Sequence, residues 1–395
     1  MTRVLEAPDG AEPSARRDGE TVLSNARLVT PEGVRPGALL IRDGRIADLS
    51  GATAVRGAED MEGDLLAPGL VELHTDNLEG HMEPRPGVRW PQAAAVVAHD
   101  AEFASVGVTT VFDAVRVGSV LSFRKANYGA YAREAADAIL RLKREGALRI
   151  SHLLHLRAEI CSETLLEEMD AFGPEDGIRI VSLMDHTPGF RQFRDVEKLR
   201  AYHEGRYGRA NMDFDAYLAF LADLKAKVGP EHEAGAVARA KALGATLASH
   251  DDTDAAHPAV SAAHGARIAE FPTTREAAEA SRAHGLAVLM GAPNLLRGGS
   301  HSGNVAAAEL AEAGLLDILS SDYAPSSLLM GALRLGELWG DVARGFATVT
   351  SAPAAATGLD DRGRLAPGLR ADLVRVADRF EAPVVRGLWV AGRRV

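Results

Sequence analysis

Two residues that could bind a metal, His74 and Asp76, end an apolar segment that begins at Leu65. In an extended strand, residues two positions apart point to the same face, so this imidazole and this carboxylate would lie side by side. Zinc and similar divalent ions accept both kinds of ligand. The pair alone is a weak indication of a metal, because similar pairs also end many solvated strands.

Four more side chains of ligand type close apolar segments further along the chain. They are Glu159, His186, His250 and Asp322. In parallel barrels the reactive side chains sit at the C-terminal ends of the strands, so these four would meet His74 and Asp76 at one end. We therefore predict one or two divalent ions there, zinc by ligand type and manganese as a substitute. Asp322 is the predicted catalytic base, which accepts a proton from a water whose pKa the metal lowers.

Glu159 has a further role if two ions bind. Dinuclear hydrolytic sites need an anionic ligand shared between the metals, either a carbamylated lysine or a carboxylate. No lysine lies between Lys143, in a predicted helix, and Lys198, beyond the segment that carries His186. Glu159 is therefore the bridging ligand that this part of the chain offers.

A glycine-rich segment from Arg297 to Asn304, RGGSHSGN, leads into an alanine-rich helix. Converging backbone N–H groups and a helix N-terminus both favour anions, and barrels often bind phosphate in the loops after the last two strands. Arginines in two other loops could add contacts to a polyphosphate, although solvation explains any single arginine equally well. The predicted substrate-binding residues are Arg85, Arg89, Arg191, Arg297, Gly298, Gly299, Ser300 and His301. The role of the basic insertion at 191–209 is left open.

The segments that must position these residues alternate strands with helices between about residues 67 and 357. The eight strand candidates are LVELHTD, VTTVFDAV, ISHLLHLRAEI, IRIVSLMDH, ATLASHD, ARIAEF, LAVLMGA and LLDILSSD. Helical segments such as Tyr131–Glu145, Phe214–Lys227 and Thr274–His284 lie between them. Apolar strands separated by helices are typical of a parallel sheet, and eight such units predict an α/β fold, a (β/α)8 TIM barrel.

Both ends of the chain are predicted to form strands. Asp43-Gly44 lies between two alternating segments, and Ala391-Gly392 has a similar place near the C-terminus. Neither end is long enough to bury a core alone, so we predict a small discontinuous β-sandwich domain formed by both termini. Its predicted limits are residues 21–66 plus 358–395, with a disordered leader at 1–20 and the barrel at 67–357.

The 395 residues carry a formal net charge of −11, and 46% of them are apolar. Nucleic acids and anionic membranes are bound by neutralising phosphates, so the acidic balance argues against both as partners. A small anionic substrate needs only a local basic pocket and stays compatible. Cys161 is the only cysteine, which excludes a disulfide within the chain and favours a cytoplasmic location. The sequence shows neither a signal peptide nor an apolar run long enough to span a membrane, and assembly into a homo-oligomer is left open.

Several segments together resemble the amidohydrolase superfamily. They are PGLVELHTDNLE, PRPGVRWP, VTTVFDAVRVG, SLMDHTPGFRQF, ASHDD, GAPNLLRGGSHSGN and SSDYAPSSLL. The likeness runs from about residue 21 to the C-terminus, and it is strongest to the branch of the family that acts in phosphonate catabolism, in the carbon–phosphorus lyase pathway. It implies a metal-dependent hydrolase that cleaves the phosphoanhydride of alpha-D-ribose 1-methylphosphonate 5-triphosphate and releases pyrophosphate.

The resemblance also implies a ligand set. The metal ligands of the family would fall on His74, Asp76, Glu159, His186, His250 and Asp322. The first strand of the wider family carries two histidines, whereas this chain has His-Thr-Asp, and glutamate takes the place of the usual bridging lysine. Two other functions stay open: a cyclic amide hydrolase or deaminase of the same superfamily, and a non-catalytic barrel subunit. The glycine-rich loop and the arginines disfavour the first, and the complete set of ligand types disfavours the second.

Overall fold

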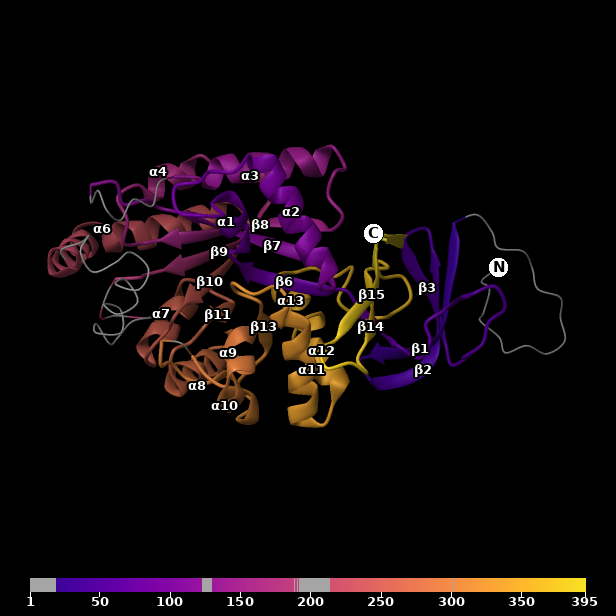
Figure 1. The fold of residues 1–395 in the computed structure, drawn as a ribbon. Coiled ribbons are helices and arrows are strands. Elements are labelled where there is room, and N and C mark those ends of the chain that lie inside the picture. Colours follow the sequence, from indigo (N-terminus) through magenta and orange to yellow (C-terminus); the bar gives the residue numbers. More distant parts are fainter. Residues whose placement is uncertain (1–18, 123–129, 188, 190, 192–213, 301) are drawn as a thin grey trace.

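A computed structural model describes residues 19–122, 130–187, 189, 191, 214–300 and 302–395 of the chain. Two β-sheets organise these residues (Figure 1). One is an eight-stranded parallel sheet, and the other is built from both ends of the chain. Residues 1–18 of the predicted leader lie outside the described residues, and the first strand begins at Glu20.

The parallel sheet confirms the predicted barrel. Its strands are β6 (Leu70–Thr75), β7 (Val108–Val117), β8 (Ser151–Glu159), β9 (Ile178–Met184), β10 (Thr246–His250), β11 (Ile268–Glu270), β12 (Ala287–Gly291) and β13 (Ile318–Ser320). They lie side by side in the order of the sequence. Seven fall within the predicted strand segments, and β7 extends two residues beyond its segment, VTTVFDAV. A bridge between Thr75 and Asp322 and a hydrogen bond of 2.5 Å from Ser320 Oγ to the carbonyl of His74 bring the last strand against the first.

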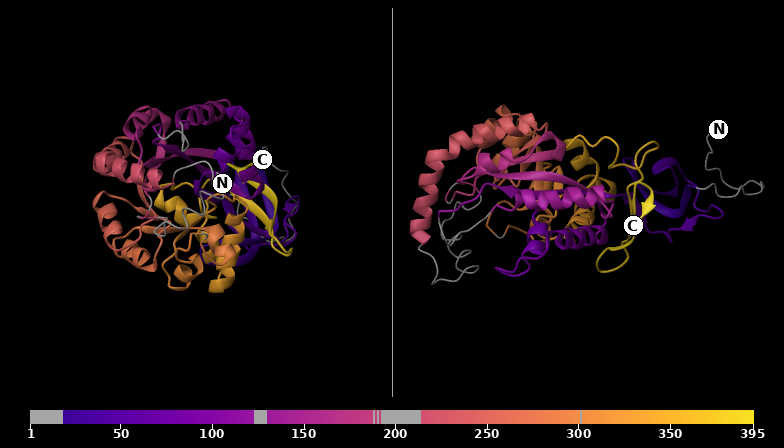
Figure 2. Two further views of the ribbon diagram at one scale, coloured as in Figure 1. Left: turned by 60° about the vertical axis from the view of Figure 1, so that its left-hand side comes forward. Right: turned by 90° about the horizontal axis from the view of Figure 1, so that it is seen from above.

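Helices connect these strands and cover the outside of the barrel (Figure 2). They are α1 (Asn77–Met82), α2 (Gln92–Ser105), α3 (Ala132–Arg144), α4 (Leu165–Asp170), α6 (Phe214–Ala242), α7 (Ala256–Ala263), α8 (Arg275–Ala283), α9 (Ala292–Arg297), α10 (Ala307–Glu312), α11 (Ser327–Trp339), α12 (Val342–Ala347) and α13 (Ser351–Ala356). The three helical segments predicted from the sequence correspond to α3, the first part of α6 and α8. Of the helices in the described ranges, none is both long enough and apolar enough for a membrane span.

Helix α6 continues beyond the predicted segment. The sequence favours a helix to Lys227, and the structure carries it to Ala242 with Pro230 inside it. A proline has no N–H for the carbonyl four residues earlier, and its ring crowds that carbonyl, so it bends a helix rather than always ending it. Figure 2 shows α6 bending along its length.

The second sheet confirms the predicted small domain built from both termini. Its strands are β1 (Glu20–Thr30), β2 (Gly33–Arg42), β3 (Arg45–Ser50), β4 (Glu59–Asp60), β5 (Leu65–Pro68), β14 (Leu373–Ala377), β15 (Val384–Val390) and β16 (Arg393–Arg394). Both predicted turns have positive φ at their two central residues, 51° and 73° at Asp43 and Gly44 and 49° and 75° at Ala391 and Gly392. Tight hairpins use this conformation because its twist matches the twist of the strands.

The two turns also meet each other, because the sheet curls around a shared core. A Cβ atom added to Gly44 would lie only 2.8 Å from the carbonyl oxygen of Ala391, so no side chain fits there. Ile46 of β3 and Trp389 of β15 belong to one buried apolar cluster, although their strands lie near opposite ends of the sheet. A single curled sheet thus encloses a core as the two layers of a sandwich would.

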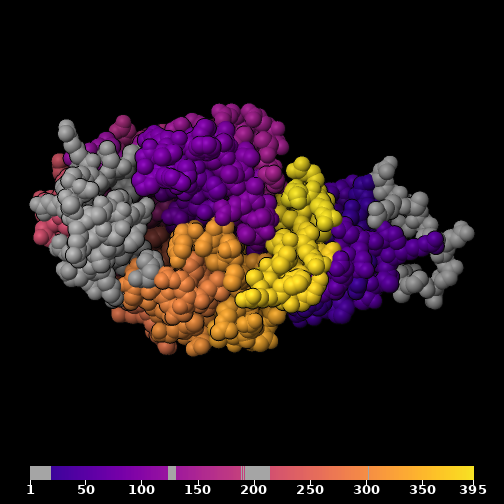
Figure 3. Space-filling view, viewed as in Figure 1, coloured from indigo at the N-terminus to yellow at the C-terminus, as the bar shows by residue number. Residues whose placement is uncertain are grey.

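The small sheet packs against the end of the barrel at which the strands begin. Val374 of β14 shares an apolar cluster with Val108, at the start of β7, and with Phe346 of α12. Arg370 donates to the Ser151 hydroxyl, at the start of β8, over 3.0 Å. Figure 3 shows the C-terminal strands, in yellow, between the barrel and the N-terminal strands, in indigo. The C-terminal ends of the barrel strands therefore face away from the small domain.

Candidate metal centre and anion site

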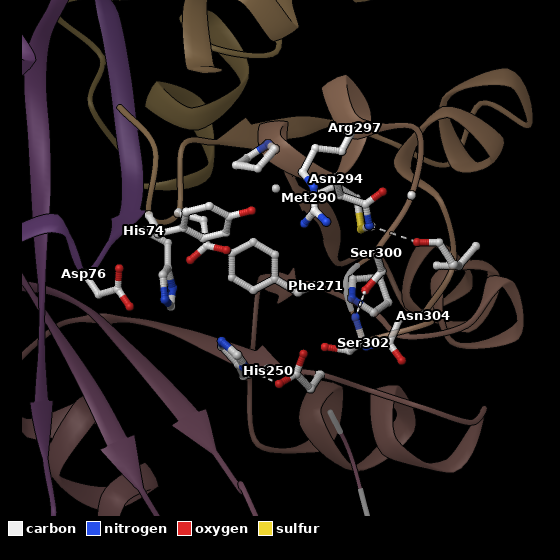
Figure 4. Close-up of a pocket in the computed structure, with 18 of the residues that line it drawn as sticks. His74, Asp76, His250, Phe271, Met290, Asn294, Arg297, Ser300, Ser302 and Asn304 are labelled. Carbon is white, nitrogen blue, oxygen red and sulfur yellow. Dashed lines mark hydrogen bonds and ion pairs between the residues drawn. The ribbon is translucent and has the colours of Figure 1, made fainter. Parts of the chain in front are cut away.

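A cavity lies at the C-terminal ends of the barrel strands (Figure 4). Its wall consists of His74, Asp76, Arg157, His186, His250, Asp251, Phe271, Pro272, Met290, Gly291, Pro293, Asn294, Arg297, Gly299, Ser300, Ser302, Asn304, Val305, Asp322 and Tyr323. His74 and Asp76 lie at the left of the view, His250 lies below its middle, and Ser300, Ser302 and Asn304 lie at the right. One space therefore joins the predicted metal site to the predicted anion site.

His74, at the end of β6, is a neutral imidazole. Burial, followed by the nearby ring of His250 with its centroid 5.3 Å away, holds the pKa of His74 well below its usual value. Its Nδ1 lies 3.0 Å from Oε2 of Glu270, but this nitrogen has no hydrogen-bond partner among the described residues. A buried neutral imidazole with an unused ring nitrogen is in the form that binds a metal.

His186 and His250 approach each other from β9 and β10. Together with Asp251 they offer one ligand atom each, and these atoms lie within 4.8 Å of one another. His250 Nδ1 is 2.9 Å from Oδ2 of Asp251, and His186 Nδ1 is 2.5 Å from Oε2 of Glu159. Burial alone would lower the pKa of His186, but the Glu159 carboxylate more than offsets this and raises it. Each imidazole is thus oriented by a carboxylate, an arrangement common among metal-binding histidines.

Asp322 follows β13 and points into the same space. Its backbone has a φ of +54°, which aspartate tolerates better than most residues do. The Thr75 hydroxyl donates a hydrogen bond of 2.9 Å to the backbone carbonyl of Asp322. Burial, and then the negative charge of Asp76, raise the pKa of Asp322 to about 8. Two neighbouring carboxylates that repel each other form a place that a cation would stabilise. The chemistry of these carboxylates and of the imidazoles in the same wall suits a divalent metal. Around this cavity, the ligand atoms that lie within 4.8 Å of one another belong to His186, His250 and Asp251, and to His74, His155 and Glu270.

The glycine-rich loop forms the other end of the cavity. Figure 4 shows the side chain of Arg297 leaving α9 toward the cavity, beside Asn294. Asn294 anchors the loop to the next helix, because its amide nitrogen donates to the Val305 carbonyl over 3.0 Å and its oxygen accepts from the Ala307 N–H over 2.9 Å. Gly298, at φ +78°, ends α9 in the left-handed conformation and turns the chain into the loop.

The predicted residues divide into those that line the cavity and those that do not. The wall includes His74, Asp76, His186, His250, Asp322, Arg297, Gly299 and Ser300. Glu159 contacts His186 from behind it, and Gly298 adjoins the wall. Arg85 and Arg89 lie in an exposed loop away from this wall. Arg191 donates to the His250 carbonyl and to Asp252, both over 2.7 Å. His301 and residues 192–213 lie outside the described residues.

Two further residues of ligand type come from the structure. Glu270 ends β11, is 1% exposed and approaches His74, and the pair forms a second group of possible ligands with His155. Asp251 follows His250 at φ +55°, which turns its carboxylate back to the preceding ring. Both could be found from the sequence: Glu270 closes the segment ARIAEF as the other ligands close theirs, and Asp251 is part of His-Asp-Asp.

A separate polar cluster lies between α2 and the strands β7 and β8. Asp113 accepts from His99 Nε2 and from His152 Nδ1, both over 2.8 Å, and all three residues are buried. Asp100 adds a contact of 3.4 Å to His152 Nε2. Burial alone would lower the pKa of His152, but Asp113 and Asp100 raise it to about 9. The cluster is therefore an imidazolium held between two carboxylates.

This raised pKa predicts a pH dependence of stability. The proton on His152 stabilises the folded chain fully below the pKa of an unfolded histidine, about 6.5, and the contribution is lost as the pH rises through about 9. Replacing His152 by glutamine removes it. The difference in unfolding free energy between wild type and His152→Gln should fall by on the order of 3 kcal/mol between pH 6.5 and 9. Urea unfolding at pH 6.5 and at pH 9 measures this difference in free energy, and the exposed His284→Gln variant serves as the control. A difference that is the same at both pH values would contradict the expectation.

The comparisons with known proteins agree on one family. Residues 101–395 match the profile described as "Amidohydrolase family". The chain is 43% identical over 380 residues to alpha-D-ribose 1-methylphosphonate 5-triphosphate diphosphatase of Escherichia coli (strain K12), which covers 95% of this chain and 100% of that protein.

Solved structures show the same fold. N-isopropylammelide isopropylaminohydrolase from Burkholderia multivorans superposes with a TM-score of 0.63 at 17% identity, over 95% of this chain and 98% of that one. The 5-methylcytosine deaminase from Klebsiella pneumoniae superposes with a TM-score of 0.61 at 18% identity, over the same shares of the two chains. At such identities the likeness concerns the fold alone.

Proposed function

The chain belongs to the amidohydrolase family, and we propose that it hydrolyses alpha-D-ribose 1-methylphosphonate 5-triphosphate and releases pyrophosphate. The observation that carries this proposal is the cavity, in which ligand-type side chains share one wall with Arg297 and the glycine-rich loop. A phosphoanhydride substrate needs both ends of this cavity, the metal-ligand end for the reacting phosphorus and the glycine-rich loop for the anionic leaving group. The name and the full-length identity of the Escherichia coli relative support the same reaction.

Residues from several strand ends would hold the metal. They are His74, Asp76, His186, His250 and Asp322, with Glu159 as the anionic bridge if two ions bind. The mixture of imidazole and carboxylate suits zinc, and manganese accepts the same ligands. A bound divalent ion supplies charge that lowers the pKa of water and offsets the negative charge of the phosphoryl group.

Residues of the chain accept the proton of the attacking water and neutralise the leaving group. Asp322 accepts the proton of the attacking water, because its carboxylate is the one that turns into the cavity after the last strand. The water oxygen bonds to the α-phosphorus as the α,β-phosphoanhydride bond breaks, and the bond electrons leave with pyrophosphate. Arg297 and the loop amides neutralise that leaving group through charge-assisted hydrogen bonds.

The proposed function also implies which partner the enzyme binds and where it is located. The partner is a small anionic substrate rather than a nucleic acid or a membrane, since the formal net charge of −11 repels phosphate polymers away from the cavity. A single cysteine and a phosphorylated metabolite as substrate support a cytoplasmic location.

The experiment that tests the function follows phosphorus directly. The purified protein, loaded with zinc or manganese, is incubated with the triphosphate, and phosphorus NMR records the products. We expect one equivalent of pyrophosphate and one of ribose 1-methylphosphonate 5-phosphate. Turnover of a hydantoin or dihydroorotate, without release of pyrophosphate by the folded and metal-loaded protein, would instead assign a cyclic amide hydrolase. The absence of any turnover would point to a non-catalytic barrel.

Two arginines provide a matched pair of variants for the anion end. Arg297 lines the cavity, whereas Arg85 lies in an exposed loop. We expect Arg297→Gln to raise KM or lower kcat/KM for the triphosphate by roughly 10- to 100-fold, as lost charged hydrogen bonds do. Arg85→Gln should leave kcat/KM within about twofold, as surface changes do. Equal losses in both variants would mean that the loop around Arg297 does not bind the triphosphate.

A further inference from the structure

Arg157, on β8, is a buried cation in the wall of the cavity. Its side chain is 13% exposed, and it lines the same space as Asp76, His186 and Asp322. A guanidinium keeps its charge at any ordinary pH. Burying such a charge inside a barrel costs desolvation free energy unless hydrogen bonds and opposite charges compensate for it. The contacts of Arg157 therefore indicate its role.

One edge of this guanidinium is already held in place. Its Nη1 donates to Glu79 Oε1 over 3.3 Å and lies 3.9 Å from Asp76 Oδ2. Glu79 is itself fixed, because the hydroxyl of Tyr131 donates to the same oxygen. The rest of the group is less well satisfied: Nε is buried and has no hydrogen-bond partner among the described residues. The contacts with Glu79 and Asp76 therefore fix the orientation of Arg157 at one edge of its guanidinium.

The position of Arg157 relative to the anion loop follows from the strand order. Arg157 lies on β8, the third strand of the barrel, and Arg297 lies on the helix that directly follows β12, the seventh. Strands four apart in an eight-stranded barrel face each other across it. The two cavity arginines therefore approach a bound substrate from opposite sides, with the metal ligands between them.

We propose that Arg157 is a catalytic residue that binds a non-bridging oxygen of the phosphoryl group attacked by water, while Arg297 holds the leaving pyrophosphate on the opposite side. This inference rests on the proposed function, because it requires a phosphoryl substrate. In the transition state the equatorial oxygens of that group carry the developing charge, and a fixed guanidinium beside them stabilises it. The part of the guanidinium that lies in the cavity wall contacts such an oxygen, while the bond to Glu79 holds the group in place.

The competing role is a structural ion pair with Glu79 and Asp76. In that case, removing Arg157 would loosen α1 and lower the affinity for metal, and activity would fall only in proportion to the metal lost. A transition-state contact behaves differently: kcat falls at constant metal content, KM changes little, and an added guanidinium ion restores part of the rate. The ratio of activity to bound metal therefore separates the two roles.

The test compares Arg157→Ala with Arg179→Gln in the full-length, metal-loaded protein. Arg179 is a matched control, since it lies on the neighbouring strand β9, bonds the Thr357 carbonyl over 3.2 Å and is not part of the cavity wall. For Arg157→Ala we expect kcat per bound metal to fall roughly 100- to 1,000-fold, with partial recovery in guanidinium chloride at concentrations that leave the fold intact. Arg179→Gln should keep kcat within about threefold.

Three outcomes are informative. Arg157→Ala with kcat per metal within about threefold of wild type would overturn the inference, even though the wild type releases pyrophosphate. A wild type that releases no pyrophosphate would overturn the proposed function first. If Arg157→Ala fails to fold, Arg157→Lys decides: lysine keeps the charge but loses the planar fork, so a drop of about tenfold or more in kcat per metal supports the contact and an unchanged kcat refutes it.

Discussion

Replacing Asp322 by asparagine is expected to lower kcat for pyrophosphate release by about a thousandfold. The asparagine amide matches the carboxylate in size but cannot accept a proton at neutral pH. Asp322 lies at the end of the barrel, in the cavity wall with the imidazoles, where the attacking water would lie. Steady-state release of pyrophosphate measures the effect.

The control for this variant is another aspartate-to-asparagine change. Asp341 begins α12 and accepts from the N–H of Arg344 over 3.0 Å, a role that asparagine also fills. Asp341→Asn should therefore keep wild-type kcat and stability. Metal content must be measured for both variants, because Asp322 is also a proposed ligand. Asp322→Asn with bound metal and a kcat within tenfold of wild type would remove Asp322 from the role of base.

Removing the metal is expected to abolish pyrophosphate release, with recovery when zinc or manganese is added back. Without a cation, the carboxylates of Asp76 and Asp322 repel each other, and this repulsion is the second cause, after burial, of the raised pKa of Asp322. The metal-free protein should therefore also unfold at a lower temperature than the loaded one, since a ligand that binds only the folded state stabilises it.

Elemental analysis and calorimetry check this expectation on the same samples. Activity should rise with bound metal and saturate at one or two ions per chain, which also determines the number of sites. A His250→Asn variant provides the comparison, because it keeps a polar side chain at the end of β10 while losing the imidazole. Full activity in wild-type protein that holds no measurable metal would refute the metal centre.

The barrel can be predicted from the sequence because local signals agree with the overall fold. Each strand is a short apolar segment, and several of them end on a polar side chain. The same rule finds His74, His186, His250 and Asp322 without any structure, since parallel strands carry their reactive residues at one end. It also covers Glu270, which ends β11 but was not counted among the predicted ligands. Ligand-type residues at the strand ends therefore include one, Glu270, that the predicted ligand set omits.

Loops are harder to predict, because sequence shows their charge but not where they lie. Arg85 and Arg297 are both arginines in glycine- or proline-containing loops, yet the cavity includes only Arg297. Helix α6 shows a similar limit: Gly229 and Pro230 are strong breaking signals, and tertiary packing carries the helix through them. Arg157 is ambiguous in the sequence, since residues of a packed core and residues of a pocket both occupy strand positions that face the barrel interior.

The strand order of the small sheet has a consequence for how the chain leaves the ribosome. Strand β5 ends at Pro68, but its neighbour β14 begins only at Leu373. The edge of β5 that pairs with β14 therefore has no partner strand while the barrel is synthesised. Open strand edges can pair with other strands. The apolar surface of the N-terminal strands is covered by Trp389, which is made only after the barrel. The sheet can therefore be completed only after the barrel between its two parts has been synthesised.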